Sequence, residues 1–195
     1  EPAPRSGRDW AREVGDAITY NARVTRILQD SQGVTVHYDA AADRVSTDMA
    51  QTTADWCICT IPFSILSQLE VDVSADMRAA MREVHYAEGF KAGLEMRRRF
   101  WETDHAIYGG ITYTDLPIDQ IAYPSQQMFS DGPGVLLGAY TFGPRAYAYN
   151  SMTPEERLDH VLENAAVIHP EVREEFTTGV ALSWHRVPWT LGCYG

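Results

Sequence analysis

The sequence predicts an α+β fold, with mixed α/β content, in which short strands outnumber helices. Apolar and polar residues alternate over several short runs, which is the period of a half-buried strand. Two other segments place apolar residues three and four positions apart, the spacing of an amphipathic helix. A chain of 195 residues with 45% hydrophobic residues suffices for one domain or for parts of two. We expect a first portion over residues 1–83 and a second over residues 84–195.

Composition argues against nucleic-acid and membrane partners. The formal net charge is -11, whereas nucleic acids and anionic bilayers attract clustered Lys and Arg. The basic run Arg97 to Arg99 is short, and we expect it at the solvated end of a strand. We also expect no membrane span or signal peptide, since no apolar run approaches roughly 18 residues.

Cysteine and histidine spacing predicts neither disulfides nor a metal site. Cys57 and Cys59 are two positions apart, which suits neither a mutual disulfide nor a Cys-x-x-Cys metal knuckle, so all three cysteines are predicted to be free thiols. His37 is expected on the polar face of a strand. The other histidines are each expected to stand alone at a helix end or in a loop, namely His85, His105, His160, His169 and His185.

In the first portion the pattern predicts a strand-rich unit. A helical turn is expected over residues 10–14, ended by Gly15, and residues 30–33 form a hairpin turn. The apolar run Trp56 to Ile61 is predicted to be a strand buried on both faces, stopped by Pro62. The remaining strands are expected at 17–21, 23–29 and 34–38, with a polar excursion over 40–53.

In the second portion the pattern predicts a mixed or antiparallel sheet with one long helix. Before it, at the end of the first portion, Ser74 can cap a helix whose apolar stripe includes Met77, Met81 and Val84. Thr153 begins a capping box for a helix over 154–169. Strands are expected at 90–96, 108–112, 120–123, 134–140 and 179–184. In the first of them, Lys91 lies on the face opposite the aliphatic one, which by alternation alone describes an ordinary solvated lysine.

Several short motifs resemble those of the flavin amine oxidases, specifically the L-amino-acid oxidase branch. They are H-Y-x-x-x-x-K (85–91), R-R-F-W-E (98–102), T-D-L-P (114–117) and Y-P-S (123–125). Further matches, such as Y-N-A-R-V-T-R-I (20–27) and C-T-I-P-F-S-I-L (59–66), extend the resemblance over nearly the whole chain. The resemblance implies that residues 1–83 are part of an FAD-binding domain and that residues 84–195 form a mixed-sheet substrate-binding domain.

The resemblance also implies which residues contact FAD. Val24 matches a position beside the adenine, and Thr60, Ile61 and Pro62 match a loop along the adenosine and pyrophosphate; from the residues alone these are a core valine and a strand end. Trp184 matches an aromatic residue near the isoalloxazine, and Trp189 is assigned to the same cofactor-binding set.

On the substrate side, the resemblance assigns a catalytic role to Lys91, which holds a water near flavin N5. Tyr140 matches a tyrosine that hydrogen-bonds the substrate carboxylate, although a tyrosine ending a strand is otherwise an edge-of-core residue. Gly192, Cys193 and Tyr194 match a segment that lines the substrate pocket.

The implied activity is oxidative deamination of an L-amino acid by O2 to a 2-oxo acid, ammonia and hydrogen peroxide. The chain has no G-x-G-x-x-G motif for the FAD pyrophosphate, so we expect companion chains or segments and a homo- or hetero-oligomer. A monoamine- or polyamine-oxidising relative and a catalytically silent subunit or fragment remain open alternatives. An extracellular location is implied by the family alone.

Overall fold

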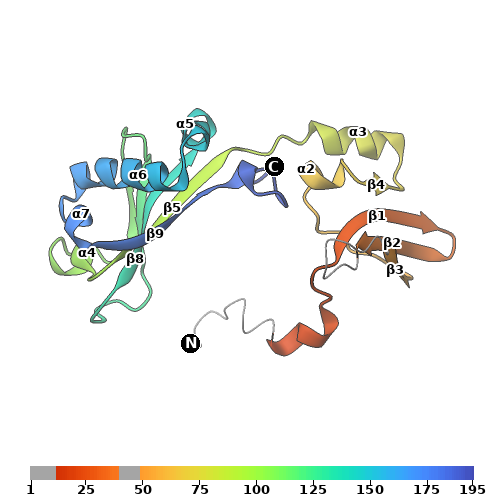
Figure 1. The fold of residues 1–195 in the computed structure, drawn as a ribbon, viewed down its shortest axis with the longest axis horizontal. Helices are drawn as coiled ribbons and strands as arrows, with labels where there is room; N and C mark the ends of the chain where they lie inside the picture. The colour runs from red at the N-terminus through yellow and green to blue at the C-terminus, as the bar shows by residue number, and fades with distance from the viewer. Residues whose placement is uncertain (1–11, 40–48) are drawn as a thin grey trace. The chain divides into compact units, whose positions relative to one another are not determined.

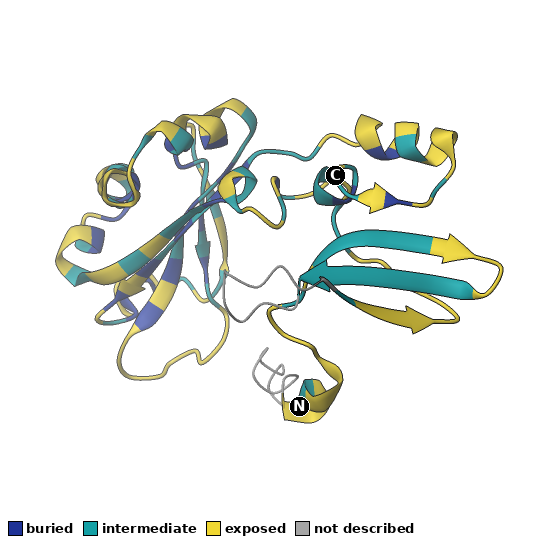
Figure 2. Cartoon of the chain, turned by 45° about the vertical axis from the view of Figure 1, so that its right-hand side comes forward, coloured by how far each residue is buried: buried dark blue, intermediate teal, exposed yellow. Residues whose placement is uncertain are grey.

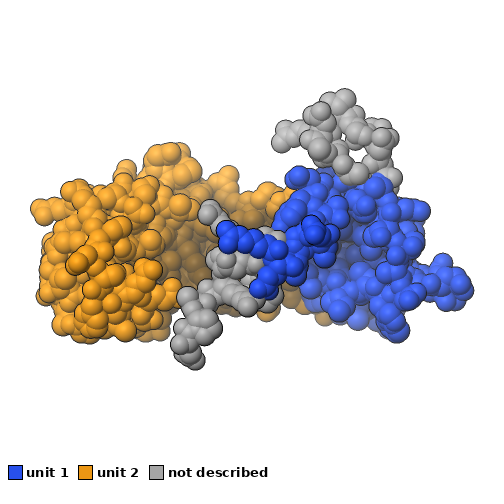
Figure 3. Space-filling view, turned by 90° about the horizontal axis from the view of Figure 1, so that it is seen from below, with its two compact units in different colours: residues 1–81 blue, residues 82–195 orange. Residues whose placement is uncertain are grey.

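The computed structural model describes residues 12–39 and 49–195, which belong to two compact units (Figures 1 and 3). Unit 1 spans residues 1–81 and unit 2 spans residues 82–195. Both units combine a β-sheet with helices, as the α+β prediction required. Within the described residues, no helix has both the length and the hydrophobicity needed to cross a bilayer.

Unit 1 is built on a four-stranded sheet with the order β3-β2-β1-β4. Its strands are β1 (Arg23–Asp30), β2 (Gly33–Asp39), β3 (Met49–Ala54) and β4 (Glu70–Val71). The predicted hairpin between β1 and β2 is confirmed, and in its turn the Gln32 amide donates to Asp30 Oδ1 at 2.7 Å. A small core comprises Leu66, Val71 and Met81, and Ile27 of β1 packs against it.

Three predictions in unit 1 were wrong. Residues 17–21 form no strand, because the helical turn at 12–14 continues through Gly15 as the 3-10 helix η1 (Gly15–Ala17) and leads into a turn. Trp10 lies outside the described residues. The polar excursion contains β3, which pairs antiparallel with β2. The residues of β3 are mostly small or polar, so no apolar alternation predicted a strand there. The strand forms because β2 supplies its hydrogen-bond partners.

The predicted strand at 56–61 is the most informative error. The segment joins no sheet among the described residues, and two of its apolar side chains are open to solvent, with Trp56 88% and Ile58 92% exposed. An apolar run becomes a strand only when neighbouring strands accept its backbone hydrogen bonds. The described residues provide no neighbouring strand for the segment 56–61.

Two helices complete this part of the chain, α2 (Phe63–Leu66) and α3 (Ala75–Glu83). The predicted cap of α3 is confirmed, since the Met77 amide donates to Ser74 Oγ at 3.1 Å. Its apolar stripe is only partly covered: Met81 is 3% exposed, whereas Met77 is 51% exposed.

Unit 2 is organised around a five-stranded sheet with the order β6-β7-β8-β5-β9 (Figure 1). The strands are β5 (Gly89–Met96), β6 (Gly110–Tyr113), β7 (Gln120–Tyr123), β8 (Gly134–Phe142) and β9 (Phe176–Ser183), each within a few residues of its prediction. All neighbouring pairs run antiparallel. β5 lies between β8 and β9 and pairs along its full length with both.

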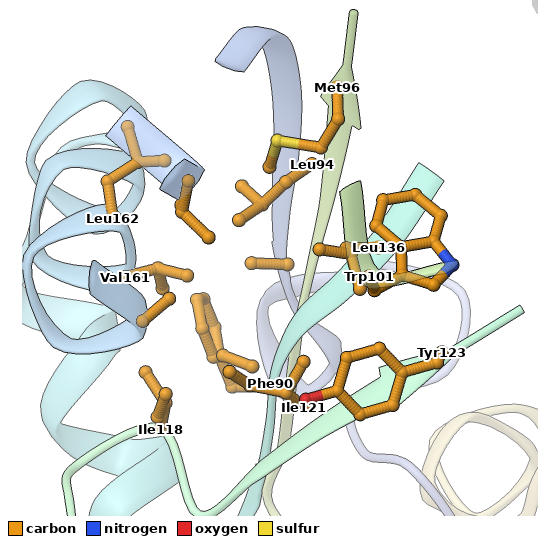
Figure 4. Packing of buried hydrophobic residues seen from close by; sticks show 14 of the residues in the cluster. Phe90, Leu94, Met96, Trp101, Ile118, Ile121, Tyr123, Leu136, Val161 and Leu162 are labelled. Carbon is orange, nitrogen blue, oxygen red and sulfur yellow. The ribbon is translucent and has the colours of Figure 1, made fainter. Parts of the chain in front are cut away.

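One face of this sheet is covered by α6 (Pro154–Ile168), the longest predicted helix. The capping box is confirmed, as the Glu156 amide donates to Thr153 Oγ1 at 3.2 Å and the Thr153 amide donates to Glu156 Oε2 at 2.7 Å. Val161 and Leu162 of α6 face Leu94 and Leu136 of the sheet (Figure 4). Buried residues therefore gather in this unit, whereas the described residues of the unit 1 sheet are half-buried or exposed apart from Val71 (Figure 2). The shorter helices are α4 (Phe100–Thr103), α5 (Gly143–Ala148), η2 (Tyr149–Ser151), α7 (Glu171–Glu175) and η3 (Trp184–Arg186).

The basic run after β5 differs from its prediction, because one of its arginines is buried. Arg99 is 5% exposed and binds Glu102 Oε1 through Nη2 at 2.5 Å, while the Phe129 amide donates to Glu102 Oε2 at 2.9 Å. The hydrogen bond from Arg99 lowers the pKa of Glu102. Arg98 stays half exposed and reaches Asp104 at 2.7 Å. Its hydrogen bond lowers the pKa of Asp104 to about 2.

We predict that Glu102→Ala destabilises unit 2 far more than Asp104→Ala. Glu102→Ala leaves a buried guanidinium without its counter-charge, which costs roughly 3 to 5 kcal/mol. Asp104 belongs to an exposed pair that solvent screens, so its loss costs far less, and Arg98 keeps Glu175. Urea unfolding followed by the fluorescence of the buried Trp101 measures both, and equal losses would contradict the prediction.

Candidate functional site

The side of β5 that faces away from the core carries Lys91 against Tyr140 of β8. The two residues are paired across the antiparallel ladder, so their side chains share one face of the sheet. Lys91 Nζ lies 4.3 Å from the centroid of the Tyr140 ring, a cation–π contact. Both side chains are half-buried, and Lys91 is the single lysine of the sequence. The alternation of β5 is confirmed, but Lys91 is not freely solvated.

Aromatic rings extend this face toward the C-terminal end of the described chain. The rings of Tyr140 and Phe142 lie 4.5 Å apart, and those of Phe142 and Tyr194 lie 5.7 Å apart, both measured between centroids. We call Lys91, Tyr140, Phe142 and Tyr194 the Lys91 face. Phe142 was missed from the sequence, although its spacing of two from Tyr140 places it on the same side of β8.

The segment Gly192–Tyr194 is held beside this face by a short backbone ladder. The Cys193 amide donates to Ala87 O at 2.9 Å, and the Ala87 amide donates to Tyr194 O at 2.8 Å. Gly89 makes the close approach possible, because a Cβ there would lie 2.8 Å from Cys193 Cβ and 2.9 Å from its Sγ. Gly192 is likewise pressed against Tyr86, at 2.3 Å from an added Cβ to Tyr86 Cβ. Cys193 is a free thiol, as are Cys57 and Cys59, which confirms the cysteine prediction.

The two predicted tryptophans follow β9. Trp184 is half-buried at the start of η3, and its Nε1 donor is buried without a partner among the described residues. Trp189 is 61% exposed. Thr190 Oγ1 donates to Trp184 O at 3.2 Å, so the chain turns back on itself after Trp184.

The predicted adenosine contacts lie in unit 1. Val24 is half-buried in β1 opposite Tyr38, which also fits a plain core valine. Thr60 is exposed, whereas Ile61 and Pro62 are half-buried, and Pro62 begins α2. The structure thus places Val24 and Thr60–Pro62 in unit 1 and all other predicted site residues in unit 2.

Unit 2 also contains a pocket of about 450 Å³ that sequence analysis did not predict. It is lined by Arg157 and Arg186, and by Ser183, whose Oγ is buried without a partner among the described residues. Burial, followed by repulsion from Arg186, lowers the pKa of Arg157. None of the residues that the sequence assigned to the cofactor or substrate site lines this pocket.

A family profile described as "Flavin containing amine oxidoreductase" matches residues 4–195, and the chain belongs to this family.

Two relatives are named as L-amino-acid oxidases, one of them as putative. The chain is 33% identical over 180 residues to the Bacillus subtilis (strain 168) protein named "Putative L-amino-acid oxidase YobN", covering 90% of this chain and 37% of the relative. It is 34% identical over 169 residues to an L-amino-acid oxidase of Gloydius halys, covering 86% of this chain and 32% of the relative. The chain therefore spans about a third of the length of these relatives.

Solved structures confirm the fold. A putrescine oxidase triple mutant superposes with a TM-score of 0.76 at 20% identity, covering 96% of this chain and 39% of that one. Cyclohexylamine oxidase from Brevibacterium oxydans IH-35A superposes with a TM-score of 0.69 at 15% identity, covering 95% and 39%. At these identities the likeness concerns the fold alone.

We predict that Gly89→Ala displaces the Gly192–Tyr194 segment. The new methyl group meets Cys193 at under 3 Å, so the segment must shift, whereas at Gly93 of the same strand an added Cβ lies 3.7 Å from its nearest neighbour, Val135 Cγ1. In a Cys57→Ser/Cys59→Ser background, the rate of Cys193 labelling by a thiol reagent should rise severalfold in Gly89→Ala. Gly93→Ala is the matched control and should label as the parent does. Identical rates in both variants would show that the close approach is not needed.

Proposed function

We propose that this chain is the central part of an FAD-dependent L-amino-acid oxidase, which converts an L-amino acid and O2 into a 2-oxo acid, ammonia and hydrogen peroxide. The observation that carries the proposal is the Lys91 face, where a half-buried ammonium lies 4.3 Å from the ring of Tyr140. The relatives named L-amino-acid oxidases, at 33 to 34% identity over most of the chain, support the substrate class.

In this proposal Lys91 positions a water molecule. Its ammonium has three donors and lies on a strand fixed on both sides by β8 and β9, so it can orient a water without moving the backbone. The ring of Tyr140 stabilises the charge of Lys91 where bulk water is partly excluded. The phenol hydroxyl of Tyr140 then donates a hydrogen bond to the substrate carboxylate.

The residues of unit 2 fit the isoalloxazine of FAD. The Lys91 face offers a cation and aromatic rings, and the unpartnered Nε1 of Trp184 is a donor that a bound group can satisfy. When bound, the flavin supplies oxidation of the substrate amine to an imine and the transfer of electrons to O2. In this proposal Trp184 and Trp189 of unit 2 would hold this end of the cofactor.

Companion segments complete the cofactor site in this proposal. A pyrophosphate needs a glycine-rich turn at a helix N-terminus, and these 195 residues contain no G-x-G-x-x-G. The exposed side chains of Trp56 and Ile58 offer such a companion an apolar surface. The isolated chain is therefore expected to hold little flavin, so activity is measured in the complete oxidase.

We predict that the complete oxidase releases peroxide with L-amino acids and that Tyr140→Phe weakens this reaction. The loss should be roughly 1 to 3 kcal/mol, about 5- to 150-fold in kcat/KM, because the carboxylate loses one donor. Tyr113→Phe, at a tyrosine 74% exposed, is the matched control.

The substrate panel separates the alternatives. Peroxide release with amines but not with amino acids would instead indicate an amine oxidase, and flavin binding without turnover would indicate a silent subunit. An unchanged kcat/KM for every amino acid in Tyr140→Phe would remove the carboxylate role.

We predict that Lys91→Met leaves folding and FAD binding intact but slows reoxidation by O2. Misplacement of a positioned water costs on the order of 100-fold, while anaerobic reduction by substrate should fall less. Arg97→Met, at the exposed end of the same strand, is the control. Stopped-flow absorbance separates the two half-reactions, and wild-type rates in both for Lys91→Met would end the proposal for this residue.

A further inference from the structure

We propose that His105, His169 and Glu171 of unit 2 bind a divalent first-row transition metal ion, for which Zn²⁺ is the reference. The proposal is independent of the oxidase activity, and none of these residues belongs to the Lys91 face. From the sequence both histidines were expected to stand alone, yet the fold brings them together, with ring centroids 4.8 Å apart.

The spacing of the ligand atoms suits a small cation. One ligand atom from each of the three residues lies within 4.8 Å of the other two, and His105 Nε2 lies 3.2 Å from Glu171 Oε1. Ligands at about 2.0 to 2.1 Å from a tetrahedral Zn²⁺ lie about 3.4 Å apart. The pairs must therefore close by at most about 1.4 Å to reach that geometry, and the exposed side chain of His105 is free to move.

Two buried atoms at the cluster lack partners, and both are metal-ligand types. His169 is 5% exposed, and its Nδ1 has no hydrogen-bond partner among the described residues. Glu171 Oε2 is also buried without one. An unpaired buried nitrogen and an unpaired buried carboxylate oxygen carry a desolvation cost that a cation between them would remove.

The other nitrogen of His169 is already fixed by a hydrogen-bond relay. His169 Nε2 lies 2.6 Å from Tyr123 Oη, which in turn lies 2.9 Å from Thr112 Oγ1. When Nε2 carries the proton and donates to Tyr123, Nδ1 presents its lone pair. Metal-binding histidines are typically held in this way by a second partner on the opposite nitrogen.

The backbone holds the ligands in place before any ion binds. The His169 amide donates to Ala165 O at 2.9 Å at the end of α6, and the Val172 amide donates to His169 O at 3.0 Å at the start of α7. His105 follows α4, and there the Ile107 amide donates to Trp101 O at 2.8 Å. A bound ion therefore joins the turn after α4 to the α6–α7 junction and stabilises unit 2.

The ligand chemistry selects the ion. Two imidazoles and one carboxylate suit Zn²⁺, Co²⁺ or Ni²⁺, whereas Mg²⁺ and Ca²⁺ prefer oxygen ligands. Since His105 is exposed, water can fill the remaining coordination positions.

The test is a titration of the untagged, chelator-treated full chain with Zn²⁺ and, separately, with Co²⁺. A Cys57→Ser/Cys59→Ser background removes the two exposed thiols as competing ligands. We expect one equivalent to bind, Co²⁺ to develop the visible absorption of bound imidazole, and Mg²⁺ to have no effect. His105→Gln and Glu171→Gln should each weaken Zn²⁺ binding at least tenfold, and Tyr123→Phe about 10- to 100-fold.

His85→Gln is the matched control, because His85 is exposed and its Nδ1 lies 3.0 Å from a backbone carbonyl, that of Glu83. Zn²⁺ should raise the thermal midpoint of the parent and of His85→Gln, but not that of His105→Gln. Failure of the parent to bind Zn²⁺ would overturn the proposal. Equal affinity in the parent, His105→Gln and Glu171→Gln would overturn it too.

Discussion

The central position of β5 between β8 and β9 is the constraint on which unit 2 depends. Alternation along this strand sends Phe90, Ala92 and Leu94 into the core, each with no measurable exposure, and leaves Lys91 on the other side. A shift of one residue in the register would exchange the two faces, burying the lysine and exposing the core. The same ladder therefore fixes the core and the candidate site.

The core side explains why the candidate site is rigid. Phe90 stacks on Tyr149 at 3.9 Å between centroids, and the helix α6 closes over the aliphatic residues of the sheet. Because close-packed cores resist displacement, Lys91 and Tyr140 keep their spacing on the opposite face. The glycine at position 89 then admits the Cys193 segment against the end of this face.

Unit 1 illustrates the opposite situation, a sheet with little to cover it. Its described core comprises Leu66, Val71 and Met81 with a few half-buried neighbours, while Trp56 and Ile58 are exposed. Large exposed apolar side chains next to one another mark surfaces that another segment covers. This chain spans about a third of the length of its L-amino-acid oxidase relatives.

The sequence by itself determined what depends on local periodicity and capping: the α+β class, the strands of unit 2, the Thr153 capping box and the family. It could not determine what depends on distant partners. The run at 56–61 is apolar enough for a strand but has no neighbouring strand among the described residues, whereas β3 is only weakly apolar but pairs with β2. Arg99 is buried because it pairs with Glu102, which also accepts a hydrogen bond from the Phe129 amide. The His105, His169 and Glu171 cluster likewise exists only in the folded chain, since its ligands come from segments far apart in sequence and no local pattern records that they meet.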